Sequence, residues 1–153
     1  MKSSAKPLPP VLLDTNVLSR LAEIGRLDLI LQVFPGRCFI SPAIYDEITA
    51  GVNNGITYLQ AIEEIVAQGG VQVVDLNQAD LEFVTTVPRK LARGEAEGIA
   101  ICRRLDMVFV THDRKAANFS EHVGISCLHF RSLIEALRRR NLLSEQEADE
   151  ALA

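Results

Sequence analysis

Acidic residues stand at four separate points of this sequence, where a predicted strand ends or a predicted helix follows a strand. Asp14 and Asp113 each close a short apolar run, whereas Glu47 and Glu95 each lie on a predicted helix. Four carboxylates that converge on one crevice repel one another unless cations neutralise them. Their hard oxygen atoms select Mg²⁺ or Mn²⁺ rather than zinc, and such ions commonly serve phosphodiester hydrolysis. Metal-dependent hydrolysis is therefore the chemistry that these residues suggest.

The first and last acids are positioned by predicted strands. The apolar run Val11-Leu12-Leu13 is typical of a parallel strand that is covered on both faces, and it stops at Asp14. Ligands of open α/β sheets bind at the carboxyl ends of their strands. The strand predicted at 107–110 ends in Thr111-His112-Asp113, so we expect both aspartates at one edge of the sheet. Each aspartate alone is equally well explained as the N-cap of the following helix.

The second acid is positioned by a helix that Ser41-Pro42 opens, since a capping residue followed by proline is a strong helix start. Ile44 and Ile48 mark the buried stripe of this helix. Glu47 borders that stripe at about 60° from Ile44. An acid in this place is either an amphipathic rim residue or a ligand that points into the crevice.

The third acid lies on a helix predicted at 94–105, which offers two candidates. Glu95 shares a face with Ile99, four residues further on. Apolar residues also occupy the other side of this helix, so helical spacing does not decide between Glu95 and Glu97. We favour Glu95 and keep Glu97 as the alternative.

The remaining pattern predicts the fold. Strands are expected at 11–13, 38–40, 71–74, 107–110 and 126–128, and helical segments at 16–24, 27–34, 42–51, 56–68, 77–88, 94–105, 114–122 and 132–153. This alternation is typical of a three-layer α/β/α sandwich around a central, mostly parallel sheet of four to five strands. Residues 1–10 are expected to form a flexible tail and residues 11–153 a single domain.

Bulk composition agrees with a globular protein. The chain has 153 residues, of which 48% are hydrophobic and 24% charged, enough to bury a substantial core. Its cysteines, Cys38, Cys102 and Cys127, lie in apolar segments without metal-binding spacing, which fits buried thiols in a cytoplasmic setting. No segment approaches a membrane-spanning length, so no membrane partner is expected. The net charge of −4 argues mildly against a general nucleic-acid-binding surface, although basic residues cluster locally.

Four motifs match those of a known family. They are Leu12-Leu13-Asp14-Thr15-Asn16, Glu47 after the second strand, Gly94-Glu95-Ala96-Glu97-Gly98-Ile99-Ala100 and Val110-Thr111-His112-Asp113-Arg114. Over about residues 11–130 the chain resembles a PIN domain, the fold of metal-dependent ribonucleases that includes the toxin halves of bacterial toxin–antitoxin pairs. The ordered set of acids carries the resemblance, because each motif alone is weak. The third acid of many toxin members is Asp, and the Gly-Glu-Ala-Glu variant here is similar to PIN proteins of unassigned role.

The resemblance implies an RNA substrate, Mg²⁺ or Mn²⁺ as cofactor, and an antitoxin protein that covers the acidic crevice. It also implies that Asn16 and Thr111 position ligands or water. The catalytic, metal-binding residues that it implies are Asp14, Glu47, Glu95 and Asp113.

Three basic residues are expected to contact substrate phosphate. Arg114 and Lys115 directly follow Asp113, and Arg103 shares the helix face of Glu95. Each is otherwise explained as solvated surface charge.

Other functions compete with a ribonuclease. The main alternative is a nuclease-inactive PIN-like module that binds RNA or protein, although an intact set of acids argues against it. A phosphatase with Asp14 as nucleophile is disfavoured, because Asn16 stands where such enzymes place a second Asp. A homodimer is also expected, from the apolar surface of the third to fifth helices.

Overall fold

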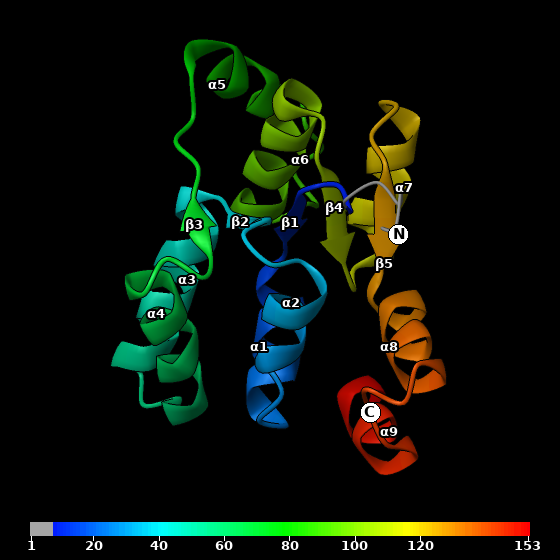
Figure 1. Cartoon of the computed structure of the whole chain (residues 1–153). Helices are drawn as coiled ribbons and strands as arrows, with labels where there is room; N and C mark the ends of the chain where they lie inside the picture. The colour runs from blue at the N-terminus through cyan, green and yellow to red at the C-terminus, as the bar shows by residue number, and fades with distance from the viewer. Residues whose placement is uncertain (1–7) are drawn as a thin grey trace, which may run out of the picture.

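A computed structural model describes residues 8–153, and a five-stranded parallel sheet lies at its centre (Figure 1). The strand order is β3-β2-β1-β4-β5. The strands are β1 (Val11–Leu13), β2 (Cys38–Ile40), β3 (Gln72–Val73), β4 (Val108–Thr111) and β5 (Cys127–His129). The α/β fold expected from the alternating pattern is confirmed. Seven residues of the predicted tail at 1–10 lie outside the described residues.

The central strand β1 shows why its sequence is wholly apolar. Val11, Leu12 and Leu13 are each at most 1% exposed, so both faces of the strand are covered. β1 pairs in parallel with β2 on one side and with β4 on the other. Because β1 and β4 are neighbours, the residues that follow them meet at one edge of the sheet.

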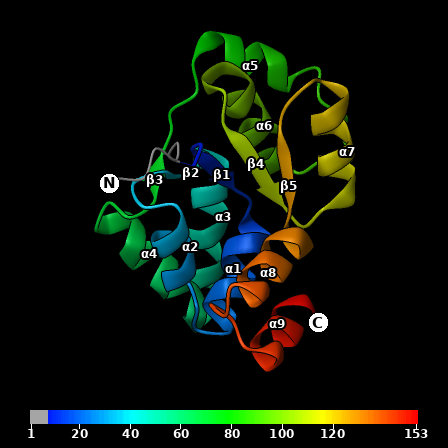
Figure 2. The same ribbon diagram turned by 45° about the vertical axis from the view of Figure 1, so that its right-hand side comes forward.

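Helices pack around this sheet, and α6 lies against both α5 and α3 (Figures 1 and 2). Gly98 brings α6 close to the sheet, since a Cβ there would come within 2.9 Å of Leu12 and Phe109 side-chain carbons. The helices are α1 (Thr15–Glu23), α2 (Asp28–Val33), α3 (Pro42–Asn53), α4 (Gln60–Ala67), α5 (Gln78–Val84), α6 (Arg93–Leu105), α7 (Arg114–His122), α8 (Phe130–Arg139) and α9 (Glu145–Leu152), and the 3₁₀ turn η1 (Thr57–Leu59) precedes α4.

The C-terminal region forms two helices rather than one continuous segment. Asn141 adopts a left-handed backbone conformation with φ of 60°, which ends α8, and Ser144 then caps α9. The buried side of α8 carries Phe130, Leu133, Ile134 and Leu137. α9 is held against α1, because Arg20 donates to the main-chain oxygens of Ala151 (3.0 Å) and Ala153 (2.7 Å).

The third strand is shorter than predicted, and its two residues are exposed at the sheet edge. All three thiols are free; Cys38 and Cys102 are buried as expected, whereas Cys127 is only partly buried. Over residues 8–153, no helix combines the length and the apolar character that a membrane crossing requires.

Candidate active site

Asp14 links the ends of two strands. Its carboxyl group is almost wholly buried, at 4% exposure of the residue. Oδ1 accepts a hydrogen bond from the Thr15 amide at 2.8 Å, and Oδ2 accepts one from the Thr111 hydroxyl at 2.8 Å. Asp14 is therefore the N-cap of α1 and also contacts the end of β4.

The Thr111 side chain also links Asp113 to Asp14. The Thr111 hydroxyl that donates to Asp14 accepts a hydrogen bond from the Asp113 amide at 3.1 Å. Asp113 caps α7, because its Oδ1 accepts from the Lys115 amide at 2.8 Å. Burial acts to raise the pKa of Asp113, but hydrogen bonds from Glu95 and from the start of α7 outweigh it and hold the pKa below its usual range.

Glu95 completes this group from α6. It is buried, and its Oε1 accepts a hydrogen bond from the Ala92 amide at 2.9 Å. The carboxyl group also lies within hydrogen-bonding reach of both Asp14 and Asp113. Burial, together with the negative charges of the two aspartates, raises the pKa of Glu95 to about 8. Burial likewise raises the pKa of Asp14. Glu95 therefore keeps a proton up to about pH 8 in the metal-free protein, which reduces the repulsion among the three carboxyl groups.

Glu47 of α3 is connected to Asp14 indirectly, through Thr15. The residue is exposed, and its Oε1 accepts a hydrogen bond from the Thr15 hydroxyl at 3.2 Å. Partial burial of the carboxyl group raises its pKa, and the charges of Asp14 and Glu97 add to the effect. The four predicted acids are therefore connected, three directly and Glu47 through Thr15.

Glu97 points elsewhere, which separates the two candidates for the third acid. Its Oε1 accepts a hydrogen bond from the Ala43 amide at 2.8 Å, at the beginning of α3. Its Oε2 accepts one from Arg93 Nε at 2.9 Å. The contacts place Glu95, and not Glu97, with Asp14 and Asp113.

The donor set suits a hard cation that keeps part of its water shell. Among residues 8–153, no three His, Cys, Asp or Glu side chains are arranged to hold a metal ion directly. The acids are linked instead by two threonine hydroxyls, since Thr15 donates to Glu47 and Thr111 donates to Asp14. Mg²⁺ commonly binds through one or two carboxylates and several waters. The chemistry of these oxygen donors therefore fits Mg²⁺ or Mn²⁺.

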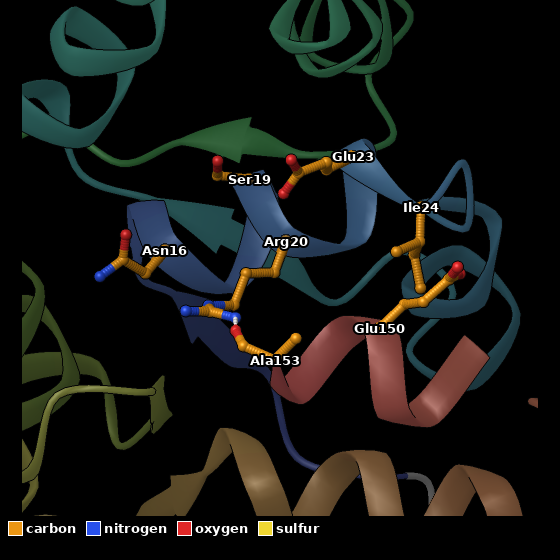
Figure 3. Close-up of a pocket in the computed structure, with 7 residues that line it drawn as sticks. All are labelled: Asn16, Ser19, Arg20, Glu23, Ile24, Glu150 and Ala153. Carbon is orange, nitrogen blue, oxygen red and sulfur yellow. Dashed lines mark hydrogen bonds between the residues drawn. The ribbon is translucent and has the colours of Figure 1, made fainter. Parts of the chain in front are cut away.

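Asn16 is exposed in the first turn of α1. It borders a cavity of about 580 Å³ between α1 and α9, and the Arg20 side chain extends in the same cavity (Figure 3). The cavity is lined by Asn16, Ser19, Arg20, Glu23, Ile24, Glu150 and Ala153. None of the four predicted acids lines this cavity.

The predicted phosphate contacts fall into two groups. Arg114 and Lys115 are exposed in the first turn of α7, directly beside Asp113. Arg103 lies in the last turn of α6, about 12 Å along the helix from Glu95. Its guanidinium group stacks on the Phe83 ring at 4.7 Å from the centroid. The structure therefore does not bring Arg103 to the acids, because Arg103 lies eight positions after Glu95 on the helix.

Two contributors were missed by sequence reasoning. Thr15 connects Asp14 with Glu47, and a hydroxyl directly after the first acid was the only signal for it. Gly94 gives Glu47 room, since a Cβ at this position would overlap Glu47 Oε1. A glycine at the start of a helix is an unusual choice there, and this was the signal for a close contact.

Comparisons with solved structures support the fold. The chain resembles VapBC-1 from nontypeable Haemophilus influenzae with 19% identity and a TM-score of 0.56, over 78% of this chain and 97% of that chain. A toxin–antitoxin complex from Klebsiella pneumoniae shows 23% identity and a TM-score of 0.54, over 69% and 88% of the two chains. A domain of a functionally unknown protein from Methanocaldococcus jannaschii shows 16% identity and a TM-score of 0.50, over 80% and 91%.

Sequence comparison identifies the family. No curated protein matches the chain. The family model DUF3368, described as a PIN domain, matches residues 10–153, which is nearly the whole chain. The acids at the ends of β1 and β4 and on α6 agree with the motifs by which the sequence resembles this family. The chain therefore belongs to the PIN domain family.

Proposed function

We propose that this protein is a Mg²⁺- or Mn²⁺-dependent ribonuclease that hydrolyses phosphodiester bonds in RNA. The observation that carries the proposal is the convergence of Asp14, Glu95 and Asp113 from three separate elements. Burial and the two neighbouring aspartates raise the pKa of Glu95 to about 8. Clustered acids with perturbed pKa values are typical of functional sites. Membership of the PIN domain family supports nuclease activity, since PIN domains are generally nucleases.

In the proposed reaction the four acids and Thr111 have different roles. Asp14, Glu95 and Asp113, with Glu47, would hold the cation, which when bound supplies an activated water and charge for the leaving oxygen. The Thr111 hydroxyl fixes the Asp14 carboxylate and the Asp113 backbone relative to each other. Glu95 must release its proton before it can act as a ligand, so binding of the cation is coupled to pH.

The substrate and partner follow from the surroundings of the acids. Arg114 and Lys115 are free to contact phosphates on either side of the cleaved bond, because both are exposed next to Asp113. The similarity to VapBC-1 and to a toxin–antitoxin complex supports a role as the toxin of a type II toxin–antitoxin pair. In that role an antitoxin segment would cover the acidic group. Pairing of two copies of the chain stays a prediction.

The proposal is tested by incubating the purified protein with a mixed RNA pool in Mn²⁺ or in EDTA. We expect cleavage only with Mn²⁺, and a rate at least about 100-fold lower for Asp14→Asn and Asp113→Asn, which equals about 2.7 kcal/mol in the barrier. Asp106→Asn is the matched control. It removes an exposed acid at the far end of α6, where Asn tolerates the left-handed backbone with φ of 56°.

Circular dichroism must show that the variants remain folded. Cleavage that persists in EDTA, or that the two site variants retain, would contradict the proposal. A wild-type protein that binds RNA but never cuts it would instead favour a nuclease-inactive binding module.

A further inference from the structure

Glu97 is a buried acid outside the group formed by Asp14, Glu95 and Asp113. It is 2% exposed, and both of its carboxylate oxygens already have partners. Oε1 accepts from the Ala43 amide, and Oε2 accepts from Arg93 Nε. A buried carboxylate is stable only when it is hydrogen-bonded and paired, and Glu97 meets both conditions within the protein.

The partner of Glu97 lies at the N-terminus of α3, where helix amides lack partners within the helix. Pro42 has no amide hydrogen, and the Ile44 amide donates to the Ser41 hydroxyl at 3.2 Å. The Ala43 amide is the remaining donor of this turn, and Glu97 accepts its hydrogen bond. The Ser41 hydroxyl also donates to the Gly94 carbonyl oxygen at 3.4 Å. Two hydrogen bonds therefore tie the start of α3 to the first two turns of α6.

Glu47 lies one helical turn beyond Ala43, on the helix that Glu97 secures. Its carboxyl group passes over Gly94, where a Cβ would overlap Glu47 Oε1 and approach Ile44 Cγ1 to 2.9 Å. From there Oε1 reaches the Thr15 hydroxyl at 3.2 Å. The direction of Glu47 toward Asp14 thus depends on the close approach of α3 to α6.

We propose that Glu97 is a positioning residue, which directs Glu47 toward the cation site by tying the N-terminus of α3 to α6. The inference rests on the proposed function, since it takes Glu47 as a ligand of Mg²⁺ or Mn²⁺. Arg93 contributes less than the Ala43 amide does, because its side chain is 75% exposed and the ion pair is screened by water. Residues behind the direct ligands commonly change metal affinity by about 10- to 100-fold when removed.

The test compares Mn²⁺ dissociation constants, measured by electron paramagnetic resonance, for the wild type, Glu97→Ala and Glu97→Gln. We expect Glu97→Ala to weaken Mn²⁺ binding by about 10-fold. Glu97→Gln keeps an oxygen that accepts from the Ala43 amide, so most of the affinity should return. Hydrogen exchange of the Ala43 amide in the metal-free protein should quicken in Glu97→Ala and stay slow in Glu97→Gln.

Asp80→Ala is the matched control for loss of a buried acid. Asp80 is also 2% exposed and also accepts from a backbone amide, Asn77 at 3.0 Å, and from an arginine, Arg104 Nε at 2.9 Å. It lies on α5, and its hydrogen bonds go to Asn77 and Arg104 rather than to a site acid. Asp80→Ala should lower the melting temperature and leave the Mn²⁺ dissociation constant unchanged.

A double-mutant cycle with Glu47→Ala separates positioning from direct ligation. If Glu97 acts through Glu47, Glu97→Ala should have little further effect in the Glu47→Ala background. An equal effect in both backgrounds, or wild-type affinity in Glu97→Ala, would overturn the inference and leave the proposed function intact. Failure of the wild type to bind Mn²⁺ more tightly than Asp14→Asn would instead contradict both.

Discussion

Glu95 performs two tasks with one carboxyl group. It accepts the Ala92 amide and so caps α6, and it also lies within hydrogen-bonding reach of Asp14 and Asp113. The first task needs only an oxygen acceptor, whereas the second brings a third carboxyl group close to two others. The raised pKa is the energetic consequence of this second task.

This pKa makes the stability of the metal-free protein depend on pH. The pKa of Glu95 rises from 4.5 to about 8 on folding, so the folded protein retains a proton that the unfolded chain releases. The resulting stabilisation is complete below about pH 4.5 and is lost as the pH rises to about 8. Burial of Asp14 acts in the same direction.

We therefore expect Glu95→Gln to stabilise the metal-free protein at pH 8.5 by about 2 kcal/mol, a value reduced for solvent screening. At pH 4 the variant and the wild type should be nearly equal. Thermal unfolding in EDTA between pH 4 and 9 measures this, with a melting temperature about 4–8 °C higher for the variant at pH 8.5. Parallel curves across the whole pH range would contradict the assigned protonation of Glu95.

At the scale of elements, the site depends on how closely α6 approaches its neighbours. Two glycines on α6 make this possible at different places. Gly98 lets the helix contact Leu12 and Phe109 of the sheet, and Gly94 lets it contact Glu47 of α3. A helix normally loses stability through glycine, so their presence here reflects contact rather than helix propensity.

Gly94→Ala should separate helix stability from site geometry. The added Cβ overlaps the flexible end of Glu47, which can move away, and it approaches the buried Ile44 Cγ1 to 2.9 Å, so repacking offsets the gain of about 1 kcal/mol in helix propensity. We expect a protein of near wild-type stability whose Mn²⁺ binding is weaker by about 10-fold, by analogy with other changes that displace a ligand. Isothermal titration calorimetry and thermal unfolding measure the two quantities.

Gly51→Ala is the control for this prediction. Gly51 also lies in a helix, α3, and its added Cβ would overlap only the side chain of Leu59 among its nearest contacts. Mn²⁺ binding should remain unchanged in this variant. Weaker binding in both variants, or in neither, would show that Gly94 has no special relation to Glu47.

At the scale of the whole molecule, two arginines in and just after α1 connect the first helix to the last helix, α9. Arg26 pairs with Glu147 of α9 at 3.0 Å and with Asp28 at 3.1 Å. Arg20 binds main-chain oxygens at the end of the same helix. The helix α9 therefore closes against α1, on the side where Asn16 borders the 580 Å³ cavity.

Arg26→Ala should loosen α9 without unfolding the core. The ion pair with Glu147 is partly exposed and screened by water, so we expect only a small loss in the free energy of unfolding. Amide exchange over residues 145–152 should become faster, because this helix opens locally. Arg104→Ala breaks an ion pair with Asp80 at a similarly exposed arginine, away from α9, and should leave exchange in α9 unchanged. Equal exchange in Arg26→Ala and wild type would show that α9 is held by apolar packing alone.

The amino-acid sequence by itself determined the order of strands and helices and the two acids that end β1 and β4. These features depend on local causes: uninterrupted apolar runs form the buried strands, and the residues that follow a strand lie at its carboxyl edge. That Asp14 and Asp113 meet follows once β1 and β4 are neighbours. The break near Asn141 within the helical C-terminal region was missed, because its residues are compatible with helix on both sides.

Only the tertiary structure decided which glutamate of α6 meets the aspartates and where Arg103 lies. Helical periodicity orients a helix when one of its faces is polar, but α6 is buried on nearly every side of its first turns, so its pattern fits several rotations. Its rotation is set by the contact of Gly98 with the sheet and of Gly94 with α3. These contacts join residues that are far apart in the chain, and no local pattern records them.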